Sequence, residues 1–255
     1  MCATCGCADG GYRIDGHAHP HEHRDHDGGG HSHEEHGTGS RTVTLEQKVL
    51  AKNDALAEQN RAWLRQHGVL AVNLMSSPGA GKTTLLERSV RELAGQPVIS
   101  VVEGDQETAL DASRIRAAGC PVVQVNTGSG CHLDAQMVAR ALQALDPPAG
   151  SVVVIENVGN LVCPALFDLG EATRVVLASV TEGADKPAKY PHMFRRADLV
   201  LVSKTDLLPY LDFDTGQCEA GIRQASPHAE VLPVSATTGA GMPAWYAWLR
   251  RRAAG

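Results

Sequence analysis

Apolar residues follow two alternating patterns from about residue 44 to the end of the chain. Nearly continuous runs of Val, Ile and Leu predict buried strands at 69–75, 98–102, 122–125, 151–155, 174–180, 199–203 and 231–234. Segments with mixed polarity between them predict helices at 82–93, 108–118, 132–145, 214–224 and 242–250. This alternation predicts an α/β fold, a mostly parallel sheet with helices on both faces.

A further helix is predicted before the first of these strands. Thr44 and Gln47 have the spacing of a capping box, and apolar residues follow at an approximately helical period. Gly68 stands where a glycine commonly ends a helix. We therefore predict one domain over residues 41–255, entered through an N-terminal helix.

The first forty residues have a different composition. They contain nine glycines, eight histidines and three cysteines, and almost no apolar side chains. Such a segment cannot bury enough apolar surface to offset its conformational entropy. We therefore predict that residues 1–40 are a disordered Cys/His-rich metal-binding tail.

Charge and composition exclude several classes of function. Seven acidic residues and two arginines give the first forty residues a charge of −5, out of −6 for the whole chain. The remainder carries no basic stripe, so we expect no nucleic-acid partner. No run of 18 apolar residues or secretory signal is present, so we expect a cytoplasmic protein that does not interact with a membrane. An odd count of seven cysteines then favours metal or redox roles over disulfides.

The segment between the first core strand and its helix predicts a phosphate-binding loop. Residues 76–83 read Ser-Ser-Pro-Gly-Ala-Gly-Lys-Thr, which is Walker A spacing with Ser76 at the first glycine position. Lys82 is expected to contact the β- and γ-phosphates, and the Thr83 hydroxyl to bind Mg²⁺. The predicted phosphate-binding residues are Ser77, Gly79, Ala80, Gly81, Lys82, Thr83 and Thr84.

A second motif indicates which base is bound. Residues 203–206 read Ser-Lys-Thr-Asp and resemble the guanine-reading Asn-Lys-x-Asp motif of GTPases. The Asp206 carboxylate can accept hydrogen bonds from guanine N1–H and N2–H₂, whereas adenine offers an acceptor at N1. Lys204 is expected to lie along the base, and Ser235 with Ala236 to form the loop that contacts guanine O6. Because Ser203 replaces the usual Asn, we expect a weaker brace within this loop.

Two carboxylates follow predicted strands beside the phosphate loop. Asp105 lies just beyond the strand at 98–102, and Glu156 directly follows the strand at 151–155. Carboxylates at the carboxyl ends of such strands hold Mg²⁺ and the attacking water. We therefore expect Lys82, Thr83, Asp105 and Glu156 to act in hydrolysis, and the Gly159 N–H to contact the γ-phosphate. No arginine finger is recognisable, so hydrolysis is expected to be slow.

The tail contains two groups of metal ligands. Cys2, Cys5 and Cys7 place three thiols within six residues, and thiolates bind Ni²⁺, Zn²⁺ or Cu⁺ well. If Met1 is removed, the amine of Cys2 is a candidate fourth ligand. Imidazoles suit nickel, copper and zinc, and the tail carries eight, at His17, His19, His21, His23, His26, His31, His33 and His36.

A third group of ligands lies within the predicted domain. Cys131 and His132 follow a glycine-rich segment, and Cys163 follows Glu156 by seven residues. A metal held by Cys131, His132 and Cys163 would respond to the nucleotide, since the loop before Cys163 is expected to contact the γ-phosphate. Water or a second subunit would complete this set. Cys120 and Cys218 are expected to be structural.

These motifs together resemble the HypB family, the hydrogenase-maturation nickel GTPases. The resemblance is carried by residues 2–7, the histidine tract, and residues 76–84, 103–105, 126–134, 156–164 and 203–206. It implies GTP hydrolysis with Mg²⁺, coupled to delivery of Ni²⁺ to a [NiFe]-hydrogenase large-subunit precursor, with Zn²⁺ as an alternative ion at the internal site. It also implies a GTP-linked homodimer and an accessory protein that binds nickel or zinc.

Two alternatives stay open at this point. A urease-type nickel GTPase has a similar phosphate loop, but the cysteines of the tail and the Cys131-His132 pair favour the hydrogenase family. A nickel storage or buffering protein with a vestigial nucleotide fold is the other. The presence of Lys82, Thr83 and Asp206 argues against it.

Overall fold

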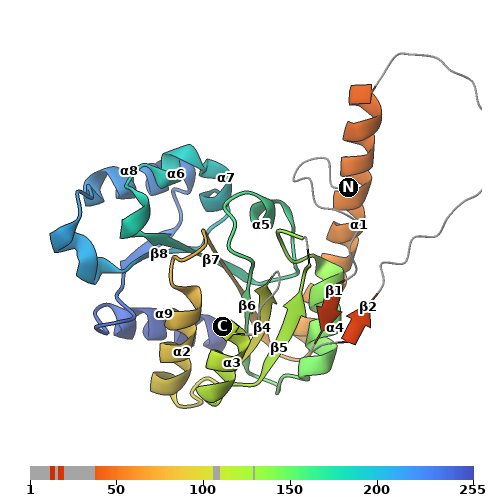
Figure 1. The fold of residues 1–255 in the computed structure, drawn as a ribbon. Helices are drawn as coiled ribbons and strands as arrows, with labels where there is room; N and C mark the ends of the chain where they lie inside the picture. Colours follow the sequence, from red (N-terminus) through yellow and green to blue (C-terminus); the bar gives the residue numbers. More distant parts are fainter. Residues whose placement is uncertain (1–11, 15–16, 20–37, 106–109, 129) are drawn as a thin grey trace, which may run out of the picture.

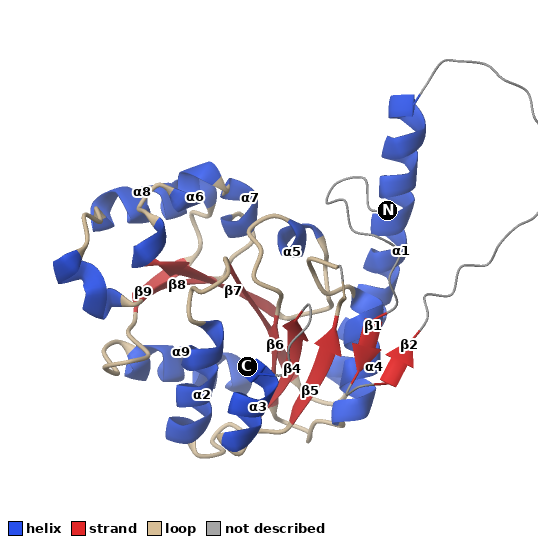
Figure 2. Ribbon diagram, viewed as in Figure 1, coloured by secondary structure: helices blue, strands red, loops and turns tan. Residues whose placement is uncertain are grey.

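The computed structural model describes residues 12–14, 17–19, 38–105, 110–128 and 130–255. Within these residues the fold is a twisted nine-stranded sheet with helices on both faces (Figures 1 and 2). The strand order is β2-β1-β5-β4-β6-β3-β7-β8-β9. Strands β3 to β9 are parallel to one another, so their carboxyl ends meet at one edge of the sheet.

The elements have the following bounds. The strands are β1 Tyr12–Ile14, β2 His17–His19, β3 Leu70–Ser76, β4 Ile99–Asp105, β5 Val122–Asn126, β6 Val152–Glu156, β7 Thr173–Ser179, β8 Leu199–Ser203 and β9 Glu230–Pro233. The helices are α1 Thr38–Gln66, α2 Lys82–Leu93, α3 Leu110–Ala117, α4 Ala135–Leu145, α5 Cys163–Leu166, α6 Lys186–Lys189, α7 Pro191–Phe194, α8 Thr215–Ala225 and α9 Met242–Ala254. Two 3₁₀ helices, η1 Val180–Glu182 and η2 Thr205–Tyr210, complete the set.

The two faces of the sheet have separate cores, because successive side chains of a strand point to opposite faces. One face packs against α2, α3 and α9, and its core includes Leu86 and Trp245. On the other face α1 and α4 pack against the sheet around Leu64 and Val138. Beside them, α7 and α8 pack around Phe194. Each such side chain, when fully buried, contributes roughly 1.5–3 kcal/mol to stability. The predicted α/β fold, a parallel sheet with helices on both faces, is confirmed.

Element boundaries differ from the predicted ones where a side chain or a neighbouring strand decides them. Strand β4 extends to Asp105 because β5 continues to pair with it as far as Asn126. The helix predicted from His132 begins instead at Ala135. Asp134 is extended and caps that helix by accepting a hydrogen bond from the Met137 N–H at 2.8 Å. His132 therefore lies in the loop before α4.

The N-terminal prediction requires a correction. Residues 12–14 and 17–19, which we expected to have no structure, form the short antiparallel strands β1 and β2. Strand β1 pairs with β5, whose outer edge would otherwise be exposed, and Ile14 is buried against the core. Helix α1 also begins at Thr38 rather than near Thr44. Among the described helices, none is long and apolar enough to cross a membrane.

Candidate functional site

The phosphate loop joins the central strand β3 to the start of α2. Gly79 and Gly81 have φ angles of 73° and 102°, a left-handed conformation in which other residues are strained. The Lys82 ammonium lies within the loop and donates to the Ser76 hydroxyl at 3.0 Å, and its burial lowers the pKa of Lys82. The Ser77 hydroxyl is buried and has no partner among the described residues. The loop therefore has the polar groups needed to bind a polyphosphate.

A buried carboxylate faces the start of α2. Glu156, at the end of β6, accepts a hydrogen bond from the Thr83 hydroxyl at 2.8 Å. Burial raises the pKa of Glu156 to about 7, although Lys82 and Thr83 act in the opposite direction. Its second oxygen accepts no hydrogen bond within the described structure. These oxygens fit a divalent cation, since Mg²⁺ prefers carboxylate and hydroxyl ligands.

A second buried carboxylate at this site was not predicted from the sequence. Glu103 of β4 is directly opposite Glu156 in the parallel register, and it is only 2% exposed. Burial and the neighbouring Glu156 raise the pKa of Glu103 to about 9, and one of its oxygens has no partner among the described residues. The available signal was an acidic residue directly after the predicted strand at 98–102. Asp105, which the sequence favoured, lies two residues further along and is half-buried.

The loop after β6 lies directly on the phosphate loop. The Asn160 N–H donates to the Ser76 carbonyl oxygen at 2.9 Å. A Cβ atom on Gly159 would lie 2.9 Å from the Pro78 Cα, so only glycine permits this approach. The same Asn160 binds through its side-chain oxygen to the N–H of Cys163, at 3.3 Å. One short loop thus connects the phosphate loop with a candidate metal ligand.

The segment that was predicted to read guanine is also tied to the phosphate loop. The Ser203 hydroxyl donates to the Ala80 carbonyl oxygen at 2.8 Å, so the serine still supplies a brace in place of the usual Asn. Lys204 donates to the Gly79 carbonyl oxygen at 2.7 Å. The Asp206 carboxylate accepts a hydrogen bond from the Ser235 hydroxyl at 2.5 Å. The structure therefore brings these predicted base-binding residues together.

Only one of the two backbone N–H groups predicted to contact guanine O6, those of Ser235 and Ala236, is left as a candidate. The Ser235 N–H already donates to the Ala240 carbonyl oxygen at 2.8 Å, which leaves Ala236 as the candidate. Arg88 of α2 fixes this loop by donating to the carbonyl oxygens of Ala236 and Thr237 at 2.9 and 3.0 Å. Arg88 was not predicted from the sequence, since nothing in its local pattern separates it from an ordinary exposed helix arginine.

Three potential metal ligands lie together at the same edge of the sheet. The ligand atoms of Cys131, His132 and Cys163 all lie within 4.8 Å of one another. Burial lowers the pKa of His132, which favours the neutral imidazole that binds metals. The His132 ring stacks on Phe167, with 3.9 Å between the ring centroids. Two thiols and one imidazole form a set suited to nickel or zinc.

The remaining candidate residues fall outside this cluster. Cys120 and Cys218 are buried in separate parts of the core, where burial raises the pKa values of their thiols to about 12 and about 11. Both are therefore structural rather than reactive, as predicted. The side chains of the predicted tail ligands lie outside the described part of the chain, so these residues stay predictions: Cys2, Cys5, Cys7, His17, His19, His21, His23, His26, His31, His33 and His36.

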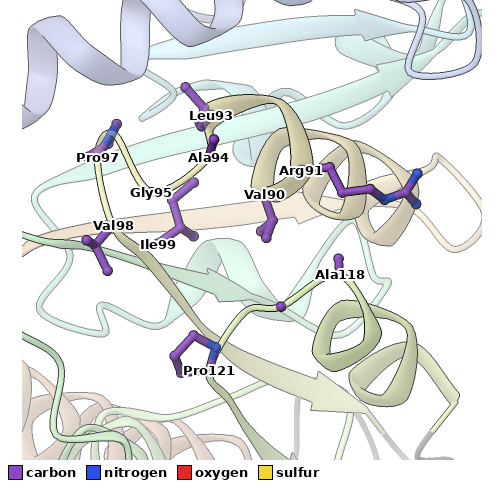
Figure 3. A pocket seen from close by; sticks show the side chains of 11 residues that line it. Val90, Arg91, Leu93, Ala94, Gly95, Pro97, Val98, Ile99, Ala118 and Pro121 are labelled. Carbon is purple, nitrogen blue, oxygen red and sulfur yellow. The ribbon is translucent and has the colours of Figure 1, made fainter.

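The molecule also has a cavity of about 390 Å³ far from these groups. It is bounded by the end of α2 and by the segments that precede β4 and β5, with Val90, Pro97 and Pro121 among its lining residues (Figure 3). In a parallel sheet these positions lie at the edge opposite the phosphate loop. The cavity therefore does not belong to the nucleotide site.

The chain is similar to known nucleotide-binding and hydrogenase-maturation proteins. The nucleotide-binding domain of the CobW/HypB/UreG family matches residues 70–233. Over 214 residues the chain is 56% identical to the hydrogenase maturation factor HypB of Rhizobium leguminosarum bv. viciae, covering 84% of this chain and 72% of that protein. In an alignment of 280 positions it is 50% identical to HypB of Azotobacter vinelandii, covering 99% of this chain and 92% of that protein. The crystal structure of HypB from Helicobacter pylori in complex with nickel aligns with a TM-score of 0.74 at 38% identity, covering 79% of this chain and 95% of that one.

Proposed function

This chain belongs to the HypB family of the CobW/HypB/UreG nucleotide-binding proteins, and on this premise we propose that it is a GTP-hydrolysing metallochaperone for nickel. In this role it binds nickel and helps to insert the ion into a [NiFe]-hydrogenase precursor. The observation that carries the proposal is the loop at 156–163. Its first part contacts the phosphate loop and its last residue, Cys163, belongs to the metal cluster.

The nucleotide is expected to bind along the edge formed by the phosphate loop and the two base-binding loops. Ser77, Thr84 and the Gly159 N–H contact phosphate oxygens, together with the loop residues from Gly79 to Thr83. Asp206 reads guanine N1–H and N2–H₂, and Lys204 lies along the base. The Ala236 N–H donates to O6, while Ser235 orients Asp206 through its hydroxyl.

Hydrolysis is expected to be slow. Water attacks the γ-phosphorus, and the bond to the β–γ bridging oxygen breaks to give GDP and phosphate. Lys82 stabilises the charge that develops on the phosphates, while Thr83, Asp105 and Glu156 hold the cation and orient the water. Magnesium, when bound, would neutralise part of the charge on the phosphates.

Nickel is the cargo rather than a resident cofactor. Cys131, His132 and Cys163 bind it inside the domain, and water or a second subunit supplies the missing ligand. Zinc is an alternative ion for this set because it accepts the same sulfur and nitrogen ligands. The cysteines and histidines of the tail form additional sites. We further propose a GTP-linked homodimer that acts in the cytoplasm with the hydrogenase precursor and an accessory metal-binding protein.

The decisive experiment measures nickel binding in two nucleotide states. We define the tail-silent chain as the full chain with Cys2, Cys5 and Cys7 replaced by serine. In this chain the thiolate-to-nickel charge-transfer absorption reports the internal cysteines, because imidazoles of the tail give no such band. Nickel is titrated in the presence of a non-hydrolysable GTP analogue and then of GDP. A difference in nickel affinity or band position between the two nucleotides supports the proposal. Identical titrations contradict a coupling between the bound nucleotide and the internal metal cluster.

A second experiment separates this proposal from metal storage. Lys82→Ala is introduced into cells that depend on this chain for an active nickel hydrogenase. Loss of hydrogenase activity with unchanged cellular nickel content supports a nucleotide-driven chaperone. Full activity in the variant would indicate that the chain acts as a nickel store, since storage does not require a phosphate loop.

A further inference from the structure

We propose that Asn53 and Asn60 of helix α1 are positioning residues for the internal metal cluster. They hold the two loops that carry the metal ligands at a fixed separation. The inference rests on the proposed function, because it assumes that Cys131, His132 and Cys163 bind a metal. It adds a role for α1, which lies outside both the phosphate loop and the cluster.

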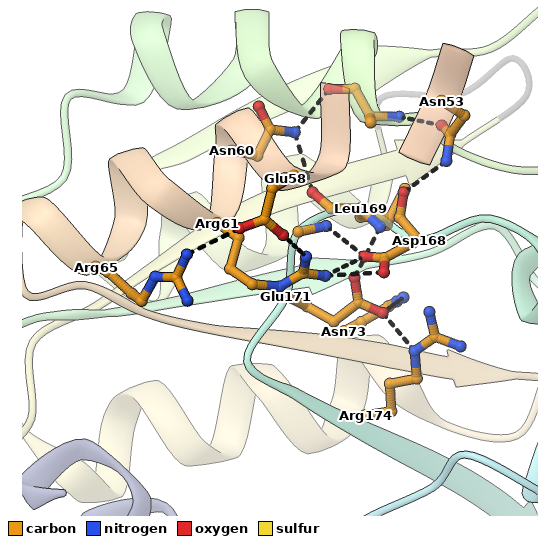
Figure 4. A network of polar contacts seen from close by, with 12 residues as sticks. Asn53, Glu58, Asn60, Arg61, Arg65, Asn73, Asp168, Leu169, Glu171 and Arg174 are labelled. Atoms are coloured by element: carbon orange, nitrogen blue, oxygen red, sulfur yellow. Dashed lines mark hydrogen bonds and ion pairs between the residues drawn. The ribbon is translucent and has the colours of Figure 1, made fainter. Parts of the chain in front are cut away.

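The two amide side chains bridge the same pair of loops (Figure 4). Asn53 accepts a hydrogen bond from the Ala135 N–H at 2.9 Å and donates to the Asp168 carbonyl oxygen at 2.8 Å. Asn60 donates to the Ala135 carbonyl oxygen at 2.8 Å and to the Leu169 carbonyl oxygen at 3.0 Å. Both polar groups of the Ala135 backbone are thus bound by α1, and so are two consecutive carbonyls of the second loop.

Each of these loops leads directly to metal ligands. Ala135 follows His132 by three residues and is the first residue of α4. Asp168 follows Cys163 by five residues, and the residue before it, Phe167, stacks on the His132 ring at 3.9 Å. A hydrogen bond to the Asp168 carbonyl therefore fixes the backbone next to Phe167. Through that ring it limits the orientations available to the imidazole.

Packing of α1 onto the domain does not by itself require these amides. Asn53 and Asn60 are each 5% exposed, and asparagine is a weak helix former that is costly to bury without partners. Apolar side chains such as Leu64 already attach the helix to the core, and Arg61 adds an ion pair to the Asp168 side chain at 2.7 Å. The amides add directional bonds that specify where the loop backbones lie. Hydrogen bonds made directly to metal ligands cost about 10- to 100-fold in metal affinity when they are lost, which sets the upper limit for these bonds to the adjoining backbone.

The test uses the tail-silent full chain and nickel alone as the probe. Asn60→Asp removes both donated bonds and places a carboxylate against two carbonyl oxygens, so we expect about 10-fold weaker nickel binding and a shifted charge-transfer band. Asn53→Asp keeps the acceptor for the Ala135 N–H and loses only the bond to the Asp168 carbonyl, so we expect a smaller loss of nickel affinity. Affinity for a fluorescent GTP analogue, measured in parallel, should be retained and shows that each variant is folded.

Two control variants separate positioning from stability. Gln59→Asp adds the same charge on the exposed side of α1 and should change neither nickel affinity nor the band. Arg61→Ala removes the ion pair to Asp168 and should lower the melting temperature while leaving the band in place. The inference is overturned if Asn60→Asp and Asn53→Asp bind nickel as the tail-silent chain does. Absence of a band in the tail-silent chain itself would overturn the proposed internal nickel site, and the inference with it.

Discussion

The Ser203 hydroxyl donates a hydrogen bond to the carbonyl oxygen of Ala80 at 2.8 Å, and both groups are buried. This bond joins the end of β8 to the phosphate loop after β3. Because Lys204 also donates to Gly79, the base-binding loop and the phosphate loop form one hydrogen-bonded unit. The base and the phosphates of a nucleotide would then be bound by groups whose positions depend on each other.

Ser203→Ala should therefore weaken nucleotide binding without touching the base. Loss of one buried hydrogen bond, with the Ala80 carbonyl left unpaired, costs about 1–3 kcal/mol, which corresponds to roughly 5- to 150-fold in affinity for GDP and GTP. Fluorescence anisotropy with a labelled guanine nucleotide measures the change. Ser100→Ala is the matched control, because the buried Ser100 hydroxyl has no partner among the described residues. Equal affinities for the two variants would contradict a bracing role for Ser203.

Asp206→Asn should change the base that is bound. The asparagine amide cannot accept both guanine N–H groups, but its N–H₂ can donate to the carbonyl at position 2 of xanthine. We expect at least about 10-fold weaker GTP binding, since hydrogen bonds to a charged group contribute about 1.5–3 kcal/mol each, and stronger binding of xanthosine triphosphate. Competition between the two nucleotides measures the switch. An unchanged preference for GTP would show that another group reads the base.

Gly170→Ala should displace α1 from the domain. Gly170 has a φ of +88°, and a Cβ there would lie 2.5 Å from the Ala57 carbonyl oxygen of α1. Gly95→Ala is the matched control, because Gly95 has a similar φ of +79° but a Cβ added there would meet nothing within 4 Å, so it tests backbone strain alone. Urea denaturation should show a loss of unfolding free energy for Gly170→Ala that exceeds the loss for the control by about 1–3 kcal/mol. Equal losses would mean that α1 can shift without cost.

Thiol reactivity should distinguish Cys131 of the metal cluster from Cys120 and Cys218 of the core. With pKa values of about 12 and about 11, only about one in a thousand or fewer of the Cys120 and Cys218 thiols is ionised at pH 8. In the tail-silent chain we expect iodoacetamide to modify the partly exposed Cys131 before Cys120 and Cys218, and nickel to slow that reaction. Mass spectrometry of the peptides over time measures the order. In urea the differences should disappear, and rapid modification of Cys120 in the folded chain would contradict its assignment to the core.

Most strands and helices could be predicted from the sequence, because the signals for each lie within a few neighbouring residues. The Val-rich runs predicted the seven parallel strands to within a few residues at each end, since a strand buried on both faces needs apolar side chains throughout. The phosphate loop could be predicted because its glycines and its lysine are close together in the sequence. Gly79 and Gly81 adopt left-handed φ angles within a single turn, and Lys82 begins the following helix.

Contacts between distant segments were decided by the tertiary structure. The pairing of Glu103 with Glu156 depends on strand register, which a list of strands does not specify. The bridges from Asn53 and Asn60 depend on how α1 packs, and an asparagine on a helix face has the same local pattern whether it is solvated or bound. The sequence by itself thus identified the nucleotide-binding motifs and the metal-binding residue types. Only the packing of helices on a registered sheet decided which of those groups lie together.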